Sequence, residues 1–336
     1  MPAAGGDGLE KLEDMIVRAA ESTAAHVRAA KAAIGTVIFG QGKVVEQALI
    51  TILSGGHALL LGVPGLAKTK LVDTMGIVLG LDARRIQFTP DLMPSDILGT
   101  EVLEESATGK RNFRFISGPV FAQLLMADEI NRASPRTQSA LLQAMQEQHV
   151  TVAGTRHDLP KPFHVLATQN PLEQEGTYPL PEAQLDRFLM EIDVDYPDRE
   201  AERRILFETT GAEETRPKAA MTADDLMAAQ RLVRRLPVGE SVVEAILALV
   251  RSARPGPEGG EGAKLIAWGP SPRASQALML AVRARALLDG RLAPSIDDVI
   301  DLAEPVLKHR MALTFSARAE GESIEAVIGR LKARIG

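Results

Sequence analysis

The segment from Gly62 to Thr69, GVPGLAKT, combines residue types that bind phosphate groups. It follows the apolar run HALLL and precedes KLVDTMGIVLGL, so we expect a strand, a loop and a helix in that order. Backbone N–H groups of such a loop converge on an anion at the start of the helix. Lys68 offers an ammonium group to the terminal phosphates, and the Thr69 hydroxyl is a Mg2+ ligand. The pattern predicts a nucleotide site, with a purely structural glycine-rich turn as the alternative.

The loop departs from the G-x-x-x-x-G-K-[ST] pattern at Ala67, where the pattern has glycine. Gly62 and Gly65 allow the backbone to lie close to the phosphates. We expect Ala67 to fall where the helix begins, and alanine, the best helix former, to be tolerated there. The predicted nucleotide-binding residues of the loop are Gly62, Val63, Pro64, Gly65, Leu66, Ala67, Lys68, Thr69 and Lys70.

An acidic pair closes a second apolar run, LLMADE. A phosphate loop needs an acidic residue at the end of a neighbouring strand to hold Mg2+, and Asp128 is placed for that role. Glu129 beside it is a candidate general base for water. The alternative is a helix cap, since Asn131 follows closely. The two motifs together favour ATP hydrolysis, with Thr69 and Asp128 as Mg2+ ligands and Asp128 also counted among the nucleotide-binding residues.

Two further polar residues lie where strands are expected to end or begin. Asn170 closes the run FHVLATQN, a position suited to orienting a water or contacting the γ-phosphate, although Asn-Pro is also a turn signal. Arg187, in LPEAQLDRF, precedes the last strand on a sheet edge away from its own phosphate loop. There an arginine reaches a neighbouring subunit's nucleotide, or else makes a surface ion pair.

Composition narrows the class of protein. The 336 residues are enough for two domains with a substantial core. A net charge of -6 and an aromatic content of 4% disfavour a broad nucleic-acid surface and base-stacking platforms. With no cysteine, disulfides, thiolate metal sites and thiol nucleophiles are excluded. No apolar run approaches the about 20 residues of a membrane span and no signal peptide is visible, so a cytoplasmic location is expected.

Short apolar runs alternate with helical patterns up to about residue 200. Such alternation predicts a parallel sheet covered by helices on both faces. The five expected strands lie in HALLLG, RIQF, AQLLMADE, FHVLATQNP and LMEIDV. Beyond residue 200 the pattern is helical throughout. We predict an N-terminal helical segment (1–35), an α/β nucleotide-binding domain (36–208) and an all-helical lid (209–336).

Two inserts interrupt the alternation. EVLEESATGKRNFRFISG contains strand-like runs around Thr108-Gly109-Lys110, and HVTVAGTRHDL contains them around Ala153-Gly154-Thr155-Arg156. Both are predicted to be β-hairpins projecting from the core, with solvated loops as the alternative.

Taken together, these motifs resemble an AAA+ ATPase, and more closely the MoxR family. The resemblance extends from about Val37 to the C-terminus. Its most specific segments are GVPGLAKT, FTPDLMPSDILGT, MADEINRASPRTQSALLQAMQE, ATQNP, GTYPLPEAQLDRF and GPSPRA. A phosphate loop with alanine before lysine is usual in that family. The resemblance implies an α/β P-loop AAA+ core with two hairpin inserts and an all-α lid.

The resemblance also implies a role for each motif residue. VIFGQ (37–41) matches the stretch that lines the adenine pocket, with Val37 and Ile38 as contacts. The implied roles are Walker A for Lys68 and Thr69, Walker B for Asp128 and Glu129, sensor 1 for Asn170, arginine finger for Arg187 and sensor 2 for Arg273. Whether Arg273 acts in cis or in trans is open.

The MoxR resemblance implies ATP and Mg2+ as cofactors and a homo-oligomer, a hexameric ring. It also implies a remodelling activity on a protein client, with a von Willebrand A domain protein as partner. The hairpin tips, 108–111 and 153–156, would face the pore. A nucleic-acid motor, with Lys110, Arg111, Arg114 and Arg156 lining a channel, and a nucleotide-switched scaffold are the alternatives. The N-terminal helix is expected to pack within its own chain, rather than on a neighbour or partner.

Overall fold

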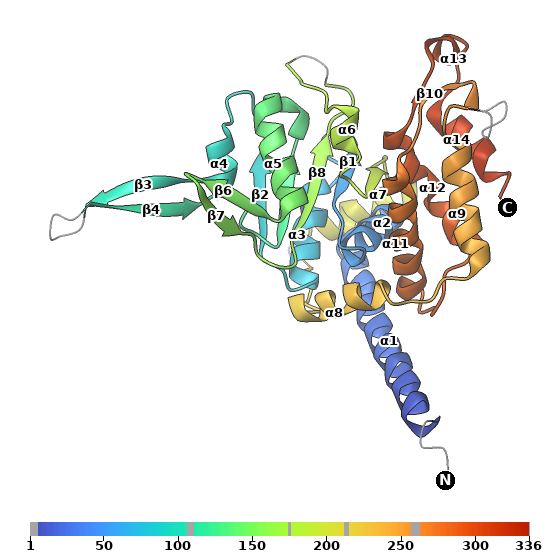
Figure 1. Cartoon of the computed structure of the whole chain (residues 1–336). Coiled ribbons are helices and arrows are strands. Elements are labelled where there is room, and N and C mark those ends of the chain that lie inside the picture. Colours follow the sequence, from blue (N-terminus) through green and yellow to red (C-terminus); the bar gives the residue numbers. More distant parts are fainter. Residues whose placement is uncertain (1–5, 106–110, 174–175, 212–214, 257–262, 336) are drawn as a thin grey trace.

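Five parallel strands in the order β2-β5-β8-β1-β9 form the central sheet of this computed structural model (Figure 1). They are β1 (Ala58–Leu61), β2 (Ala83–Gln87), β5 (Leu124–Asp128), β8 (His164–Gln169) and β9 (Met190–Asp193). All five predicted strands are confirmed, with their predicted mutual direction. The structure describes residues 6–105, 111–173, 176–211, 215–256 and 263–335, without the side chains of residues 6–19.

Helices precede, separate and follow the strands. Those up to residue 209 are α1 (Gly6–Gly35), α2 (Gly42–Leu53), α3 (Lys68–Val78), α4 (Pro94–Leu98), the 3-10 turn η1 (Ile130–Arg132), α5 (Pro135–Glu147), α6 (Glu182–Leu185) and α7 (Arg199–Thr209). Two of them match predicted signals closely. The helix after the phosphate loop ends just before Gly80, which has a positive φ, and α5 has Pro135 as its first residue after the capping hydroxyl of Ser134.

Successive side chains of each strand point to opposite faces of the sheet, and each face has its own buried cluster. In β1, Ala58 and Leu60 join α2 and α3, whereas Leu59 joins the cluster that contains α5. Both clusters are apolar and mostly aliphatic, because a parallel sheet covered on both faces excludes water from either side. The predicted α/β core is therefore confirmed.

The two inserts are antiparallel hairpins, as predicted, and they project together from one end of the sheet (Figure 1). The first comprises β3 (Gly99–Glu105) and β4 (Arg111–Ser117); its expected tip, 108–110, lies outside the described residues. The second comprises β6 (His149–Val152) and β7 (Thr155–Asp158). Its turn is only Ala153-Gly154, both with positive φ, so the prediction that placed Thr155 and Arg156 in the turn was wrong.

The C-terminal helical region contains α8 (Ala223–Val233), α9 (Glu240–Ser252), α11 (Pro272–Leu288), α12 (Ile296–Leu307), η3 (Lys308–Arg310), α13 (Phe315–Ala319) and α14 (Ile324–Lys332). Its helical character is confirmed, with one addition: β10 (Ile266–Trp268) and β11 (Ala312–Leu313) form a short antiparallel pair. The pair is only two to three residues long, too short for a strand signal in the sequence.

The buried cluster on the α2 side of the sheet continues without interruption into the C-terminal helical region. It includes Val27 of α1, Leu49 of α2, Leu226 of α8 and Leu278 of α11. The second half of α1 therefore packs within the chain, as expected, against α2, α3, α8 and α11. One buried cluster thus includes residues of all three predicted segments, and the division into these segments stays a prediction.

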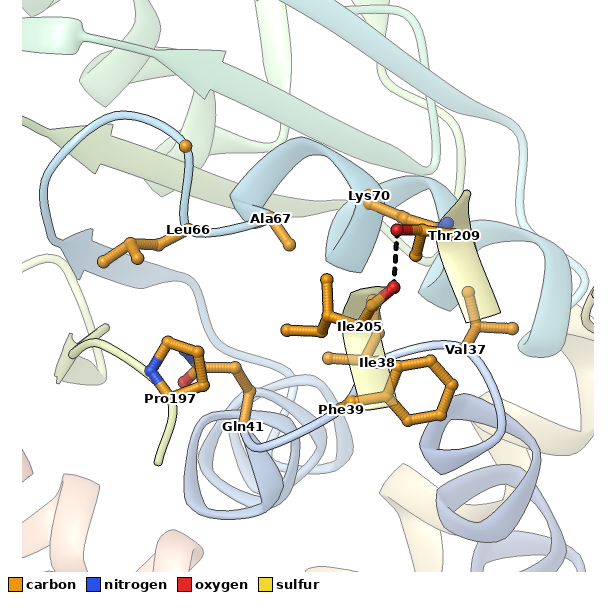
Figure 2. A pocket seen from close by; sticks show the side chains of 11 residues that line it. Val37, Ile38, Phe39, Gln41, Leu66, Ala67, Lys70, Pro197, Ile205 and Thr209 are labelled. Carbon is orange, nitrogen blue, oxygen red and sulfur yellow. Dashed lines mark hydrogen bonds between the residues drawn. The ribbon is translucent and has the colours of Figure 1, made fainter. Parts of the chain in front are cut away.

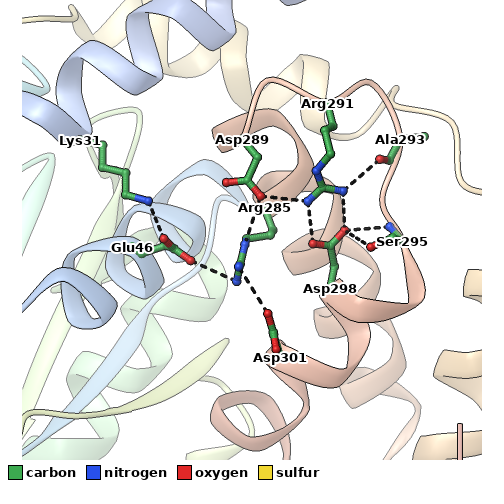
Figure 3. Close-up of polar contacts among 9 residues, drawn as sticks. All are labelled: Lys31, Glu46, Arg285, Asp289, Arg291, Ala293, Ser295, Asp298 and Asp301. Atoms are coloured by element: carbon green, nitrogen blue, oxygen red, sulfur yellow. Dashed lines mark hydrogen bonds and ion pairs between the residues drawn. The ribbon is translucent and has the colours of Figure 1, made fainter. Parts of the chain in front are cut away.

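A polar network follows the same junction (Figure 3). Glu46 of α2 accepts from Lys31 of α1 at 2.5 Å and pairs with Arg285 of α11 at 3.1 Å. Arg285 also reaches Asp301 of α12 at 3.4 Å. Such pairs contribute little free energy each, and together they connect α1, α2, α11 and α12 at this junction.

Two buried histidines support the start of the sheet. The Nδ1 atom of His57 accepts the backbone N–H of Val165 at 2.9 Å. His164 donates from Nδ1 to the carbonyl of Gly56 at 2.8 Å and accepts at Nε2 from Gln230 of α8 at 3.0 Å. Both rings are thus neutral in the folded state, and burial lowers the pKa of His57 to about 3 and that of His164 to about 4.

We predict that acid destabilises the protein through these histidines. Because their pKa values are lowered on folding, the unfolded chain binds protons that the folded chain does not as the pH falls below about 6.5. The contribution of the two histidines to the free energy of unfolding is therefore fully present above pH 6.5. It decreases toward pH 4, by about 3 kcal/mol for His164 alone. Urea midpoints between pH 7.5 and 4 measure the effect.

The matched control is His26→Gln at an exposed position of α1, which should leave the pH dependence unchanged. His164→Gln should make the midpoint less dependent on pH. If His164→Gln kept the full dependence, another group would be responsible.

Candidate active site

The sheet brings the predicted Walker residues to one edge. Gly62 follows β1, Asp128 ends β5 and Asn170 follows β8, and these three strands are parallel neighbours. The loop and the acidic pair line a common cavity of about 450 Å3, formed by Pro64, Gly65, Ala67, Lys68, Thr69, Lys70, Arg85, Gln87, Asp128 and Glu129. Asn170 lies at the same edge of the sheet, and its amide Oδ1 accepts the N–H of Leu172 at 3.1 Å.

The phosphate loop has the shape that an anion cradle requires. Gly65 has a φ of 88° and no atom within 4 Å of where a Cβ would stand, so the space above it is open. A Cβ at Gly62 would lie 2.6 Å from the carbonyl oxygen of Val194, so only glycine fits there. The Lys68 ammonium donates to the carbonyls of Gly62 and Val63, which keeps it inside the loop.

Lys68 lies in a charged but partly dehydrated setting. Burial lowers the pKa of its ammonium group, while the nearby carboxylates of Asp128 and Glu129 oppose that shift. An ammonium group, a hydroxyl and two carboxylates beside the backbone of a glycine-containing loop are the groups expected to bind a nucleoside triphosphate with Mg2+. The residues present therefore fit both, with Thr69 and Asp128 as those that would hold the metal ion.

The reason we gave for alanine at position 67 was wrong. Ala67 does not begin the helix: α3 starts at Lys68, and Ala67 caps it in the left-handed conformation, with φ 57° and ψ 21°. Its carbonyl accepts the first helical bond, from Leu71 at 2.9 Å. Helix propensity is therefore irrelevant at this position, and the methyl group costs about 1–2 kcal/mol there.

The acidic pair is held by side chains that the sequence did not single out. Asp128 accepts from Thr168 at 2.6 Å and pairs with Arg85 at 2.5 Å. Glu129, with a φ of 55°, accepts from Gln87 at 2.7 Å. Gln87 could have been predicted, because it is the last residue of β2 and pairs with Asp128 in the register. Arg85 and Thr168 had none, because each lies within a strand and acts only across it.

A smaller, mostly apolar pocket of about 120 Å3 adjoins the loop (Figure 2). The predicted contacts Val37 and Ile38 line it, together with Phe39 and Gln41 of the same VIFGQ stretch and with Leu66 of the loop. The sequence did not indicate the opposite wall, which is formed by Pro197, Ile205 and Thr209. A flat apolar pocket beside a phosphate cradle suits a purine base.

Arg187 and Arg273 lie elsewhere. They share a cavity of about 240 Å3 with His57, Met145, Gln146, Asp186 and Gln276. The register explains the separation: Met190 pairs with Ala58 at the start of β1, so Arg187 lies at the edge of the sheet opposite the phosphate loop. The length of β1 alone sets them about 10 Å apart. Arg273, at the start of α11, reaches Asp186 at 3.8 Å.

Known proteins share this arrangement. The family model described as an ATPase family associated with various cellular activities (AAA) matches residues 57–190, and a model of the AAA lid domain matches residues 263–331. Chaperone MoxR1 of Mycobacterium tuberculosis is 42% identical, over 97% of this chain and 87% of its own length. Protein MoxR of Paracoccus denitrificans is 33% identical, over 86% of this chain and 89% of its own length.

A solved structure, of a candidate ATPase from Cytophaga hutchinsonii, superposes with a TM-score of 0.88 at 37% identity and covers 98% of this chain and 99% of that one. Fold, phosphate loop and acidic pair together define an AAA+ ATPase. The chain belongs to the MoxR family of these ATPases.

We predict that Ala67→Gly stabilises the protein. The substitution removes the left-handed penalty of about 1–2 kcal/mol and loses about 0.4–1 kcal/mol through the more flexible unfolded chain, so a net gain of about 0.5–1 kcal/mol is expected. Urea unfolding measures it.

The matched control is Ala25→Gly at an exposed position in the middle of α1, which should lose about 1 kcal/mol. Equal losses at both positions would show that the methyl group at position 67 is not strained.

Proposed function

We propose that this protein hydrolyses ATP as a ring oligomer, a hexamer, and uses the energy to remodel a protein client together with a von Willebrand A domain partner. The observation that carries the proposal is the position of Arg187. It stands at the edge of the sheet opposite the phosphate loop of its own chain, so we assign it to the nucleotide of a neighbouring copy.

Within one subunit, the residues of the phosphate-loop edge bind ATP and activate water. Lys68 and the backbone of 62–69 bind the phosphates, and Thr69 and Asp128 would hold Mg2+, which would neutralise the charge of the phosphate groups. Glu129 takes a proton from the attacking water, and Asn170 orients that water. The Gln87 amide keeps the Glu129 carboxylate in the cavity at 2.7 Å.

Arg187 and Arg273 complete the neighbouring site. They line one cavity, and Arg273 is 57% exposed at its side chain while it contacts Asp186. This favours action in trans for both arginines, because neither lines the cavity that holds Lys68. Cationic groups supplied from a neighbour stabilise the charge that develops in phosphoryl transfer.

We predict that Arg187→Ala lowers the rate of ATP hydrolysis by about 10³-fold or more and leaves ATP affinity little changed. Steady-state hydrolysis and binding of a fluorescent ATP analogue measure the two effects. Glu129→Gln subunits, which lack the base but keep Arg187, should restore turnover when mixed with Arg187→Ala subunits. Loss of ATP binding in Arg187→Ala would instead indicate a structural role within the subunit.

Remodelling of a protein is favoured over transport of nucleic acid. One relative carries the name chaperone. The arginines that would line a nucleic-acid channel are paired with acidic neighbours on their own hairpins: Arg114 with Glu104 at 2.9 Å and Arg156 with Asp158 at 2.8 Å. Within the described residues no helix is long and apolar enough to cross a membrane. The cytoplasmic location stays a prediction.

We predict that Glu129→Gln, purified with ATP from lysate of its native cell, retains a von Willebrand A domain protein and a client. The substitution removes the base but keeps the metal ligand, so the ATP-bound state persists. Mass spectrometry of the eluate identifies what is held, and Lys68→Ala, which should bind no ATP, is the control. Nuclease-sensitive nucleic acid in place of protein would favour the motor, and an eluate without either would contradict the proposed client.

A further inference from the structure

A buried arginine of the C-terminal helical region contacts the segment that carries Arg187. Arg310 ends η3 and is only 3% exposed. Its Nε donates to the carboxylate of Asp186 at 2.7 Å. Its Nη1 donates to the carbonyls of Leu189 at 3.0 Å and Val306 at 2.5 Å, and its Nη2 to those of Phe188 at 2.5 Å and Asp186 at 3.4 Å. All five guanidinium N–H groups are therefore used.

The two residues before Arg310 hold the same stretch. The ring of His309 is buried and neutral, and its Nε2 donates to the carbonyl of Phe188 at 3.1 Å. The Lys308 ammonium pairs with Asp193 at 2.5 Å and with Glu191 at 3.4 Å, both on β9. Three consecutive residues of η3 thus fix the chain from 186 to 193.

A second element reaches the same point. The hydroxyl of Ser271, which caps α11, donates to Asp186 at 3.2 Å, and Arg273 approaches the same carboxylate at 3.8 Å. Asp186 therefore joins η3 and α11 to the residue next to Arg187. Its side chain contacts the C-terminal helical region, and Arg187 is the next residue in the chain.

We propose that Arg310 is a positioning residue for Arg187: it fixes the backbone before β9 so that the Arg187 guanidinium meets the nucleotide of the neighbouring subunit. This rests on the proposed function, in which Arg187 acts in trans. Without Arg310, the half-buried carboxylate of Asp186 and the carbonyls of Asp186, Phe188 and Leu189 each lose one donor, and of the described residues of the C-terminal helical region only Ser271 and His309 still donate to this segment. The segment then shifts to find other partners, and a shift of about 1 Å at a catalytic group costs about 10²-fold in rate.

Lysine cannot replace arginine at this position. The five donors of Arg310 diverge in one plane toward oxygen atoms of four residues, whereas a lysine offers three N–H groups from a single atom. Arg310→Lys therefore keeps the charge and loses the geometry. Because the proposed role is exerted on Arg187, the defect belongs to the subunit that donates the finger.

Mixed oligomers separate this role from a general structural one. Subunits with Glu129→Gln donate Arg187, and subunits with Arg187→Ala supply the working site, so turnover of the mixture reports on the donated finger. Arg310→Lys is added either to the donor or to the acceptor subunit. We expect at least a tenfold loss of turnover when the donor carries it, and little change when the acceptor does.

The matched control is Arg291→Lys in the donor subunit. Arg291 also makes a two-pronged pair, with Asp298 at 2.7 and 2.8 Å, but entirely within the C-terminal helical region. Turnover should persist with this variant. Melting temperature and oligomer size are measured for every subunit, and if Arg310→Lys does not fold, Asp186→Asn in the donor tests the same contact.

Three results are informative. Loss confined to the donor supports the positioning role. Equal loss from donor and acceptor overturns it, since a purely structural residue acts in both subunits. If the mixture of Glu129→Gln and Arg187→Ala subunits with Arg310 intact shows no turnover, Arg187 does not act in trans. That result contradicts the proposed function itself, separately from the role of Arg310.

Discussion

The parallel register of β1 with its two neighbours determines at which edge of the sheet the phosphate loop and Arg187 lie. Because β8 and β9 run alongside β1 in the same direction, everything that follows a strand gathers at one edge, and everything that precedes β9 stands at the other. The phosphate loop and the acidic pair belong to the first edge, and Arg187 belongs to the second. In the proposed function, each subunit therefore contributes the phosphate loop at one edge and Arg187 at the other, and two subunits together complete a site.

The C-terminal helical region contacts the edge of the sheet that carries Arg187. Of its described residues none lines the cavity of the phosphate loop, yet η3 binds the stretch before β9 through hydrogen bonds to its backbone. The network around Glu46 joins the same region to α1 and α2. Backbone carbonyls are fixed acceptors with few alternatives inside a protein, so contacts to them place a segment more firmly than ion pairs between exposed side chains do.

Much of this arrangement was predictable from local sequence. Apolar runs, glycines and the pair Asp128-Glu129 identify strands and the residues after them, and parallel topology then brings these residues together without further information. What escaped prediction acts across the fold. Arg85 and Thr168 meet Asp128 only because of strand order, and Arg310 meets Asp186 across 124 positions. Ala67 escaped for a different reason: whether a residue is the last of a loop or the first of a helix decides its φ, and sequence patterns place such boundaries poorly.

The continuous buried cluster has a consequence for how such a chain changes over evolutionary time. Val27, Leu49, Leu226 and Leu278 belong to elements spread along most of the sequence, yet they share one dry interior. A helical region of this kind is not an exchangeable module, because a replacement from another protein would expose the apolar surfaces of α1 and α2 or fail to fit them. Substitutions that change side-chain volume on one side of this cluster are therefore tolerated best when the facing helices change with them.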